Sequence, residues 1–160
     1  MAYDPSPTTQ DGLSIIIQNF NNGLDPSLRI DDTNFAFDPP INNPDAAVTK
    51  NTRMFARPVA TSGRYGRVSI YYDRMDLDAV TDKPVITRGE HTLWSQVVPL
   101  INSYYGINIV AADYTDGPLP AQVGAIMDVP LMMLPGSYMF IGGLVVGLKT
   151  GTPAGIAKRV

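Results

Sequence analysis

The chain of 160 residues contains no cysteine and a single histidine, so it has few of the side chains that carry out chemistry in proteins. Without cysteine it can form no disulfide scaffold, no thiolate nucleophile and no ordinary structural zinc site. Charged residues make up only 17% of the chain, and a formal net charge of −3 does not favour binding to nucleic acid. We therefore expect a protein that is not an enzyme, with no cofactor and no specific nucleic-acid partner.

Glycine and proline, by contrast, are abundant, with 14 residues of each. Proline removes a helical hydrogen bond and glycine loses much backbone entropy on ordering, so this composition excludes a bundle of long helices. We expect a β-rich α+β fold, with a small antiparallel sheet or sandwich, one kinked helix and extended N- and C-terminal arms. The expected organisation is an extended arm over residues 1–12, a single domain over 13–148 and a tail over 149–160.

Hydrophobic patterning predicts several strands in the first half of the chain. Residues 13–20 contain three consecutive isoleucines, which favour a strand, and residues 29–37 are a second candidate. Residues 51–60 and 65–73 predict a β-hairpin, because apolar and polar residues alternate in its second half. This alternation predicts three side chains that face the core: Val68, Ile70 and Tyr72.

One helix is indicated between residues 87 and 106. Thr87 and Glu90 have the spacing of a capping box, and Gly106 stands where a helix C-terminus belongs. Pro99 lies inside this segment and should kink the helix, because proline has no N–H to donate. Apolar residues at helical spacing predict the face that packs on a sheet: Leu93, Val97, Leu100, Ile101 and Tyr104.

The uncharged segment over residues 131–148 has a length at the lower limit for a membrane-spanning helix. Pro135 and Gly136 fall inside it and are typical of a turn. Splitting the segment there leaves residues 137–148, a length suited to a buried strand. We favour the buried strand and expect no membrane partner. The N-terminus has neither the basic residues nor the apolar core of a secretory signal.

The polar residues show no motif for catalysis or metal binding. His91 is not accompanied by the sequence signature of a catalytic triad. Asp113 and Asp116 could act as an acid–base pair, but their surroundings are an ordinary turn sequence. Four aspartates in a connector could bind Ca²⁺, yet the glycine and the final glutamate of an EF-hand loop are missing, so we interpret them as solvated and salt-bridged. They are Asp73, Asp76, Asp78 and Asp82.

A basic run lies in the predicted hairpin, where arginines are interleaved with Phe55 and Tyr65. Such an arrangement could hold single-stranded nucleic acid through phosphate contacts and stacking. It could equally bind the acidic N-terminal part of a neighbouring copy, since residues 1–50 contain seven aspartates. We favour the second interpretation. The candidate interface residues are Arg53, Arg57, Arg64, Arg67, Asp31 and Asp32.

Three stretches of the sequence share features with a known protein family. They lie in the hairpin, at the helix exit and in the C-terminal strand, and read VSIYYDRMDL over residues 68–77, LINSYYGINI over 100–109 and GSYMFIG over 136–142. With the turn residues around them, they span roughly residues 50–145 in the same order. In these stretches the chain resembles a family of small virion structural proteins from large tailed bacteriophages. The resemblance implies a non-enzymatic component of a phage particle.

The expected function is therefore structural, with many copies of the chain assembling in a tailed-phage virion that forms in the host cytoplasm. Capsid decoration, cement or another role at the head is the first placement, and a tail, neck or baseplate component is the alternative. The expected partners are copies of the chain and other virion proteins, such as the major capsid protein. Two other classes remain open. In a ligand- or carbohydrate-binding module Tyr65, Tyr71 and Trp94 would line a cleft, and a membrane-associated protein would insert residues 131–148.

Overall fold

The computed structural model describes residues 12–151, which divide into two compact units. In order along the chain, the first unit contains residues 12–75 and 135–139, and the second contains residues 76–134 and 140–151. The single domain expected over residues 13–148 thus comprises both units. The arms expected over residues 1–12 and 149–160 lie outside the described residues, except for their inner ends.

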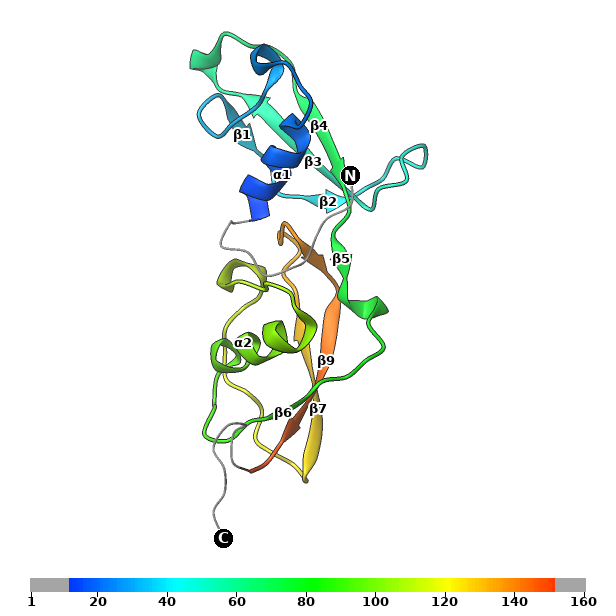
Figure 1. Cartoon of the computed structure of the whole chain (residues 1–160), viewed down its shortest axis with the longest axis vertical. Coiled ribbons are helices and arrows are strands. Elements are labelled where there is room, and N and C mark those ends of the chain that lie inside the picture. Colours follow the sequence, from blue (N-terminus) through cyan, green and yellow to red (C-terminus); the bar gives the residue numbers. More distant parts are fainter. Residues whose placement is uncertain (1–11, 152–160) are drawn as a thin grey trace. The chain divides into compact units, whose positions relative to one another are not determined.

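The first unit is built around β3 (Thr52–Pro58), the central strand of a four-stranded antiparallel sheet (Figure 1). On one edge β3 pairs with β4 (Val68–Tyr72), which confirms the predicted hairpin. On its other edge β3 pairs with β1 (Phe35–Phe37) near its end and with β2 (Ile41–Asn42) near its start. The hairpin therefore holds the whole sheet together, because every other strand pairs with β3.

Side chains alternate between the two faces of this sheet, as the geometry of an extended chain requires. On β3 the inward side chains are fully buried, and the outward ones are half-buried or exposed. The inward residues are Thr52, Met54 and Ala56, and the outward residues are Arg53, Phe55 and Arg57. On β4, Ile70 and Tyr72 are buried as predicted, while Val68 is half-buried at the start of the strand.

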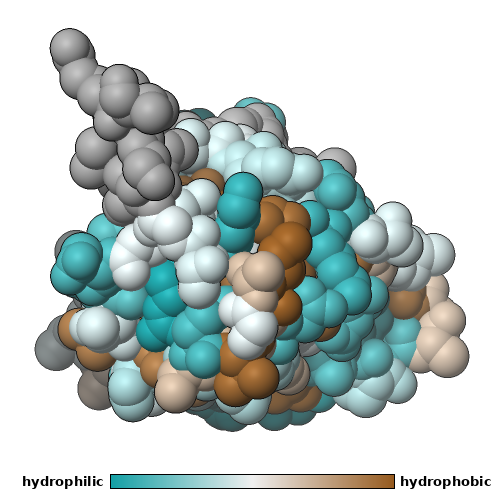
Figure 2. Space-filling view, turned by 90° about the horizontal axis from the view of Figure 1, so that it is seen from below, coloured by the Kyte–Doolittle hydropathy of each residue, from teal (hydrophilic) through white to brown (hydrophobic). Residues whose placement is uncertain are grey.

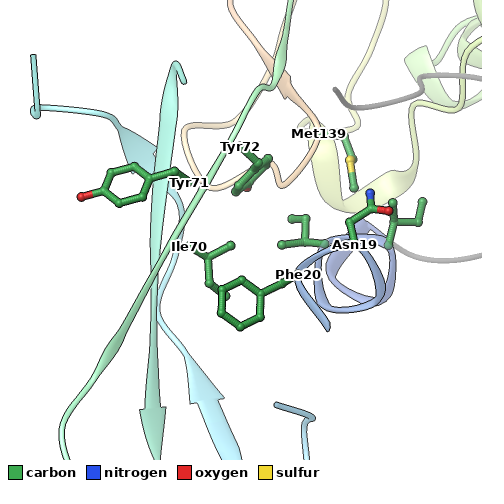
Figure 3. Close-up of a pocket in the computed structure, with 8 residues that line it drawn as sticks. Asn19, Phe20, Ile70, Tyr71, Tyr72 and Met139 are labelled. Carbon is green, nitrogen blue, oxygen red and sulfur yellow. The ribbon is translucent and has the colours of Figure 1, made fainter. Parts of the chain in front are cut away.

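Residues 13–20 form a helix, so the strand predicted there is wrong. The helix α1 (Gly12–Asn21) faces β4, buries Ile16 and leaves Phe20 half-buried (Figure 3). These two positions are four residues apart, the spacing of neighbours on one helix face. The isoleucines favour an extended chain locally, but packing of this face beside the sheet outweighs such a weak preference.

The second candidate strand, over residues 29–37, forms only at its end. Asp31 organises a turn ahead of β1, because its carboxylate accepts the N–H groups of Thr33 and Asn34, each at 2.9 Å. Aspartate often holds its own backbone in a turn in this way. The extended conformation therefore begins only at Phe35.

The second unit contains a three-stranded sheet with β9 (Gly143–Lys149) at its centre (Figure 1). β6 (Val85–Thr87) runs parallel to β9, and β7 (Ile126–Met132) runs antiparallel to it. The sequence does not indicate β7, since Pro130 lies within it, but a strand at the edge of a sheet tolerates proline. The predicted class, a β-rich α+β fold with antiparallel sheets, is confirmed; the described residues form two α-helices rather than one.

The uncharged segment over residues 131–148 is extended rather than helical. It contains the end of β7, the short strand β8 (Phe140–Ile141) and most of β9, and Gly142 separates β8 from β9. β8 pairs with β5 (Met75–Asp76) in a two-stranded sheet. The prediction of a buried strand is confirmed for β9, where three side chains are fully buried: Leu144, Val146 and Leu148. Within residues 12–151 no helix is long and apolar enough to cross a membrane.

The predicted helix is present as α2 (Trp94–Tyr105), and Gly106 ends it in the left-handed conformation, with a φ of 66°. Its predicted N-terminal cap is wrong, because Thr87 is the last residue of β6 and pairs with β9. The cap is instead provided by Gln96, whose side-chain oxygen accepts the two backbone N–H groups just before the helix. Because Thr87 pairs within the sheet, it does not cap the helix, as its spacing to Glu90 predicts it would.

The buried face of α2 is rotated from the predicted one. Val97 and Ile101 are fully buried, as predicted, but Trp94 is buried with them and cannot line a surface cleft. Together with Val98 these residues have the spacing of one helix face. Three residues predicted to be buried are exposed instead: Leu93, Leu100 and Tyr104.

Candidate interaction surface

Three of the predicted interface arginines surround one aromatic ring on the outward side of the first unit's sheet. The guanidinium carbon of Arg67 lies 4.1 Å from the centre of the Phe55 ring, that of Arg53 lies 4.5 Å away and that of Arg57 lies 5.8 Å away. Arg53, Phe55 and Arg57 are alternate residues of β3, so the pleat places them on one face. We call these four side chains the arginine face.

The charges on the arginine face are only partly balanced. The guanidinium of Arg57 forms an ion pair with Asp38, with 2.8 Å between Nη2 and Oδ2, and hydrogen bonding to this carboxylate raises the pKa of Arg57. Arg53 and Arg67 have no carboxylate within ion-pair distance among the described residues. The Nε of Arg53 is also buried and has no hydrogen-bond partner in residues 12–151. The face therefore presents two positive charges that no carboxylate among the described residues balances.

Apolar side chains lie on both sides of this charge. Ile41 of β2 and Tyr71 of β4 are each paired with Arg53, so their side chains share its face of the sheet. Ile41 is 45% exposed and Tyr71 is half-buried. A positively charged centre with apolar neighbours is a suitable surface for a protein partner, because such interfaces combine buried aromatic and arginine residues with polar ones.

Arg64 does not belong to the arginine face, although it was predicted as part of the same run. Its guanidinium donates to the carbonyl oxygens of Ser27 and Arg29 at 3.0 and 3.1 Å, and it lies over the ring of Phe35. These hydrogen bonds hold the 27–29 segment in place, so the guanidinium of Arg64 forms its contacts inside the first unit.

The two predicted acidic residues, Asp31 and Asp32, form no ion pair with the arginine face within the described part of the chain, and Asp31 lies close enough to Arg64 for the charge of Arg64 to act on it. A hydrogen bond from the Thr33 hydroxyl lowers the pKa of Asp31, and the charge of Arg64 acts in the same direction. Asp32 is an exposed residue of the following turn. Of the four predicted arginines, the structure brings three together around Phe55.

A second exposed surface, on the sheet of the second unit, was not indicated by the sequence. Residues of β6, β7 and β9 that are paired across the sheet point to its outward face, and several of them are apolar. The exposed apolar residues of this outward face are Val85, Ile126, Met132 and Val145. Figure 2 shows apolar atoms at the surface among hydrophilic ones. Exposed apolar residues that gather on one sheet face are typical of a protein-interaction site.

The connector aspartates have local hydrogen-bonding roles. Asp73 pairs with Lys50 at 2.9 Å, and Asp76 accepts the N–H of Asp78. Asp78 in turn accepts the N–H of Gly143 at 2.9 Å. No cluster of three or more potential metal-binding residues is found in the described part of the chain. The predicted ion pairing is therefore found for Asp73, whereas Asp76 and Asp78 accept backbone N–H groups.

The first unit also contains a pocket that the sequence did not reveal. It lies between α1 and β4 and has a volume of about 230 Å³ (Figure 3). Because residues 13–20 were predicted as a strand, the sequence-based prediction placed no helix opposite β4. The four-residue spacing of Ile16 and Phe20 is the signal that would have found it.

The profile of a protein family, described as a family of unknown function (DUF7941), matches residues 7–158. The chain belongs to this family. No curated protein matches the DUF7941 chain, and no solved structure matches it either. The family description names no activity, so the function of this DUF7941 protein is argued from its surfaces: the arginine face, the outward sheet face of the second unit and the pocket.

Proposed function

We propose that the protein is a non-enzymatic structural component of a tailed-phage virion, in which many copies assemble with one another and with other virion proteins. Decoration or cementing of the capsid is the first placement, and a tail, neck or baseplate position is the second. The motifs in the hairpin, at the helix exit and in the C-terminal strand support this proposal through their resemblance to phage structural proteins. The surfaces of the two units support it independently.

The observation that carries the proposal is the incomplete arginine face. Arg53 and Arg67 have no carboxylate partner among the described residues. A carboxylate bound by guanidinium groups is among the stronger polar contacts in proteins. An acidic segment of a neighbouring subunit would complete the face.

A protein partner fits this face better than nucleic acid. Asp38 already neutralises Arg57, and a phosphate backbone would have to approach this carboxylate. The formal net charge of the chain is −3, whereas proteins that coat nucleic acid present a dominant basic surface. The apolar neighbours Ile41 and Tyr71 give a partner protein further surface to bury.

The outward sheet face of the second unit offers a different kind of contact. Val85 and Ile126 meet over Gly147, since a methylene at this glycine would lie 3.4 Å from a methyl group of each. Both side chains are more than half exposed. Burial of exposed apolar side chains is the main source of stability in protein association. A subunit with one charged and one apolar contact surface is suited to bind two neighbours at once.

Mass spectrometry of virions purified by density gradient tests the proposal directly. We expect the protein at a fixed ratio to the major capsid protein, and its absence from intact particles would overturn the proposal. A ratio near that of the capsid subunits supports the decoration role, and a much lower fixed ratio supports a place in the tail, neck or baseplate.

A pair of charge reversals tests the arginine face within the particle. We expect the double variant Arg53→Glu, Arg67→Glu to fold normally and to be lost from virions. The matched control is Lys83→Glu, because the ion pair of Lys83 with Asp128 is exposed and such pairs contribute little. Incorporation of both variants at the native level would show that the arginine face is not the contact.

A further inference from the structure

One edge of β4 is unpaired, because within the described residues β4 pairs only with β3. The carbonyl oxygen of Phe55 accepts the N–H of Asp38 at 2.9 Å, so the backbone of Phe55 faces β1. The hydrogen-bonding groups of successive strand residues face opposite edges. The backbone of Met54 therefore faces β4 and bonds its partner in the register, Ile70.

The free edge of β4 is open to a further strand. On either side of Ile70, the N–H and C=O groups of Ser69 and Tyr71 point away from β3 and have no hydrogen-bond partner within residues 12–151. Ser69 is exposed and Tyr71 is half-buried. Edge strands often carry a proline or a charge that hinders further pairing, as β7 does with Asp128 and Pro130. β4 contains neither a proline nor a charged residue.

The pocket between α1 and β4 lies along this edge. Three consecutive residues of β4 line it: Ile70, Tyr71 and Tyr72. The side chains of Ile70 and Tyr72 point toward α1 and that of Tyr71 points to the other face, so Tyr71 borders the pocket through its main chain (Figure 3). The other walls are mainly apolar and belong to the first unit. The volume of about 230 Å³ is below the roughly 300 Å³ of a drug-sized site but admits an apolar side chain.

The arginine face lies on the opposite side of the same edge. Tyr71 is paired with Arg53, and the guanidinium of Arg67 lies over the Phe55 ring. Arg53 and Arg67 have no carboxylate partner among the described residues. A strand added to β4 would direct alternate side chains to the two faces, one set into the pocket and the other toward Arg67.

We propose that the edge of β4 binds an extended segment of a partner protein as an added strand, with an apolar side chain opposite Ile70 and a carboxylate opposite Arg67. Main-chain hydrogen bonds to Ser69 and Tyr71 hold the segment, and its two side chains give specificity. The added strand runs antiparallel, the slightly more stable arrangement, so the apolar residue precedes the acidic one by three positions. The inference rests on the proposed function, because it names the kind of segment that the arginine face binds.

The first experiment titrates a peptide with blocked ends, Thr-Thr-Leu-Thr-Thr-Asp-Thr, into the purified full-length protein. We expect hydrogen exchange to slow at the amides of Ser69 and Tyr71 and to change little at Ile70, which already bonds β3. Absence of binding at millimolar peptide, or protection without this alternation, would overturn the proposal. Either result would leave the virion proposal intact, because that proposal is decided by the composition of particles.

Two N-methylated peptides test the main-chain bonds. The threonine after the leucine donates to the carbonyl oxygen of Ser69 in this register. A methyl group on its nitrogen should weaken binding about five-fold or more, the effect of one neutral hydrogen bond. The matched control carries the methyl group on the leucine nitrogen, which points away from β4, and should bind nearly as the parent peptide does. Equal affinities of the two methylated peptides would contradict strand addition.

Side-chain replacements in the peptide test the pocket and the charge. Serine in place of the leucine should weaken binding about ten-fold, because it removes the apolar contact. Asparagine in place of the aspartate should weaken it about three-fold, and less at high salt. Arg67→Gln should abolish the preference for aspartate, while Lys83→Gln, at an exposed ion pair of the second unit, should keep it. If the native protein binds all three peptides equally, the proposal is wrong.

Discussion

Arg74 donates a hydrogen bond from Nη1 to the carbonyl oxygen of Ser137 at 3.1 Å, although the two residues are 63 positions apart in the chain. Both residues are almost completely buried. The same guanidinium also donates to the Thr52 hydroxyl at 2.9 Å and to the side chain of Asn42 at 3.0 Å. Arg74 thus joins β2, β3 and the 135–139 segment of the first unit through one planar group with several fixed donors.

Replacing Arg74 should destabilise the first unit strongly. Arg74→Met leaves the Thr52 hydroxyl and the carbonyl oxygens of Pro135 and Ser137 without this donor, so we expect a loss of about 3 kcal/mol or more in the free energy of unfolding. Urea denaturation followed by circular dichroism measures this loss. Arg74→Lys should restore little of it, because an ammonium group cannot reproduce the planar arrangement of donors. A lysine variant of native stability would show that charge alone matters here.

Removing the unpartnered hydroxyl of Tyr72 should make the protein more stable. Tyr72→Phe keeps the buried ring and removes a hydroxyl that has no hydrogen-bond partner among the described residues, so we expect a gain of about 1 kcal/mol in the free energy of unfolding. Thermal unfolding measured side by side with Tyr71→Phe provides the comparison, since the half-buried Tyr71 should change stability little. A large loss of stability in Tyr72→Phe would indicate that the hydroxyl already has a partner.

The same tyrosine should make the protein sensitive to alkali. Burial raises the pKa of Tyr72 in the folded state above its ordinary value of about 10. At a pH between the two values the unfolded chain loses the proton and the folded chain keeps it, so stability is intact below the ordinary value and falls as the pH rises above it. Urea denaturation across this alkaline range should show that the free energy of unfolding falls less with rising pH in Tyr72→Phe than in the native protein. An unchanged decline would assign the sensitivity to other tyrosines.

Asp116 should make the N-terminus of α2 sensitive to acid. Its carboxylate accepts the N–H of Ser95 in the first turn at 2.9 Å, and hydrogen bonds from Ser95 lower the pKa of Asp116. The folded-state pKa is below the unfolded one, so this contribution is present above the ordinary aspartate value of about 3.9 and is lost as the pH falls through the lowered pKa. Asp116→Asn should therefore reduce stability at neutral pH and flatten its acid dependence. Denaturation curves at several pH values measure both effects.

Gly142 should not tolerate a side chain. Its φ is +79°, and an added Cβ would lie 2.6 Å from an oxygen of Asp78. Gly142→Ala should cost about 2 kcal/mol or more in the free energy of unfolding, from strain and from displacing Asp78. Gly136→Ala is the matched control, since nothing lies within 4 Å of a Cβ added there. Equal stabilities of the two variants would contradict the close approach of Asp78 to Gly142.

Local patterns predicted some elements correctly and missed others for a common reason. The alternation that ends in Ile70 and Tyr72 predicted β4, because a half-buried strand must alternate whatever its partner. Gly106 predicted the end of α2, since the left-handed conformation favours glycine. The isoleucines of residues 13–20 and the cap at Thr87 were misread, because packing beside β4 and pairing with β9 decided their conformations.

The arginine face likewise combines features that a local pattern predicts with contacts that it does not. The spacing of Arg53, Phe55 and Arg57 along one strand is enough to place them on one face, whichever protein surrounds them. The sequence could not show that Arg64 binds the 27–29 segment, or that Asp38 pairs with Arg57 while Arg53 has no such partner among the described residues. Those pairings join positions far apart in the chain.

The sequence by itself thus determined a cysteine-free, β-rich domain with an alternating hairpin in which arginines are interleaved with aromatic residues. These features follow from composition and from the two-residue period of a strand. Only the tertiary structure decided that residues 13–20 become a helix, that a pocket lies between this helix and β4, and that two arginines have no carboxylate partner among the described residues. The physical reason is that burial and charge pairing depend on which distant segments of the chain come into contact. A local sequence pattern does not specify those contacts.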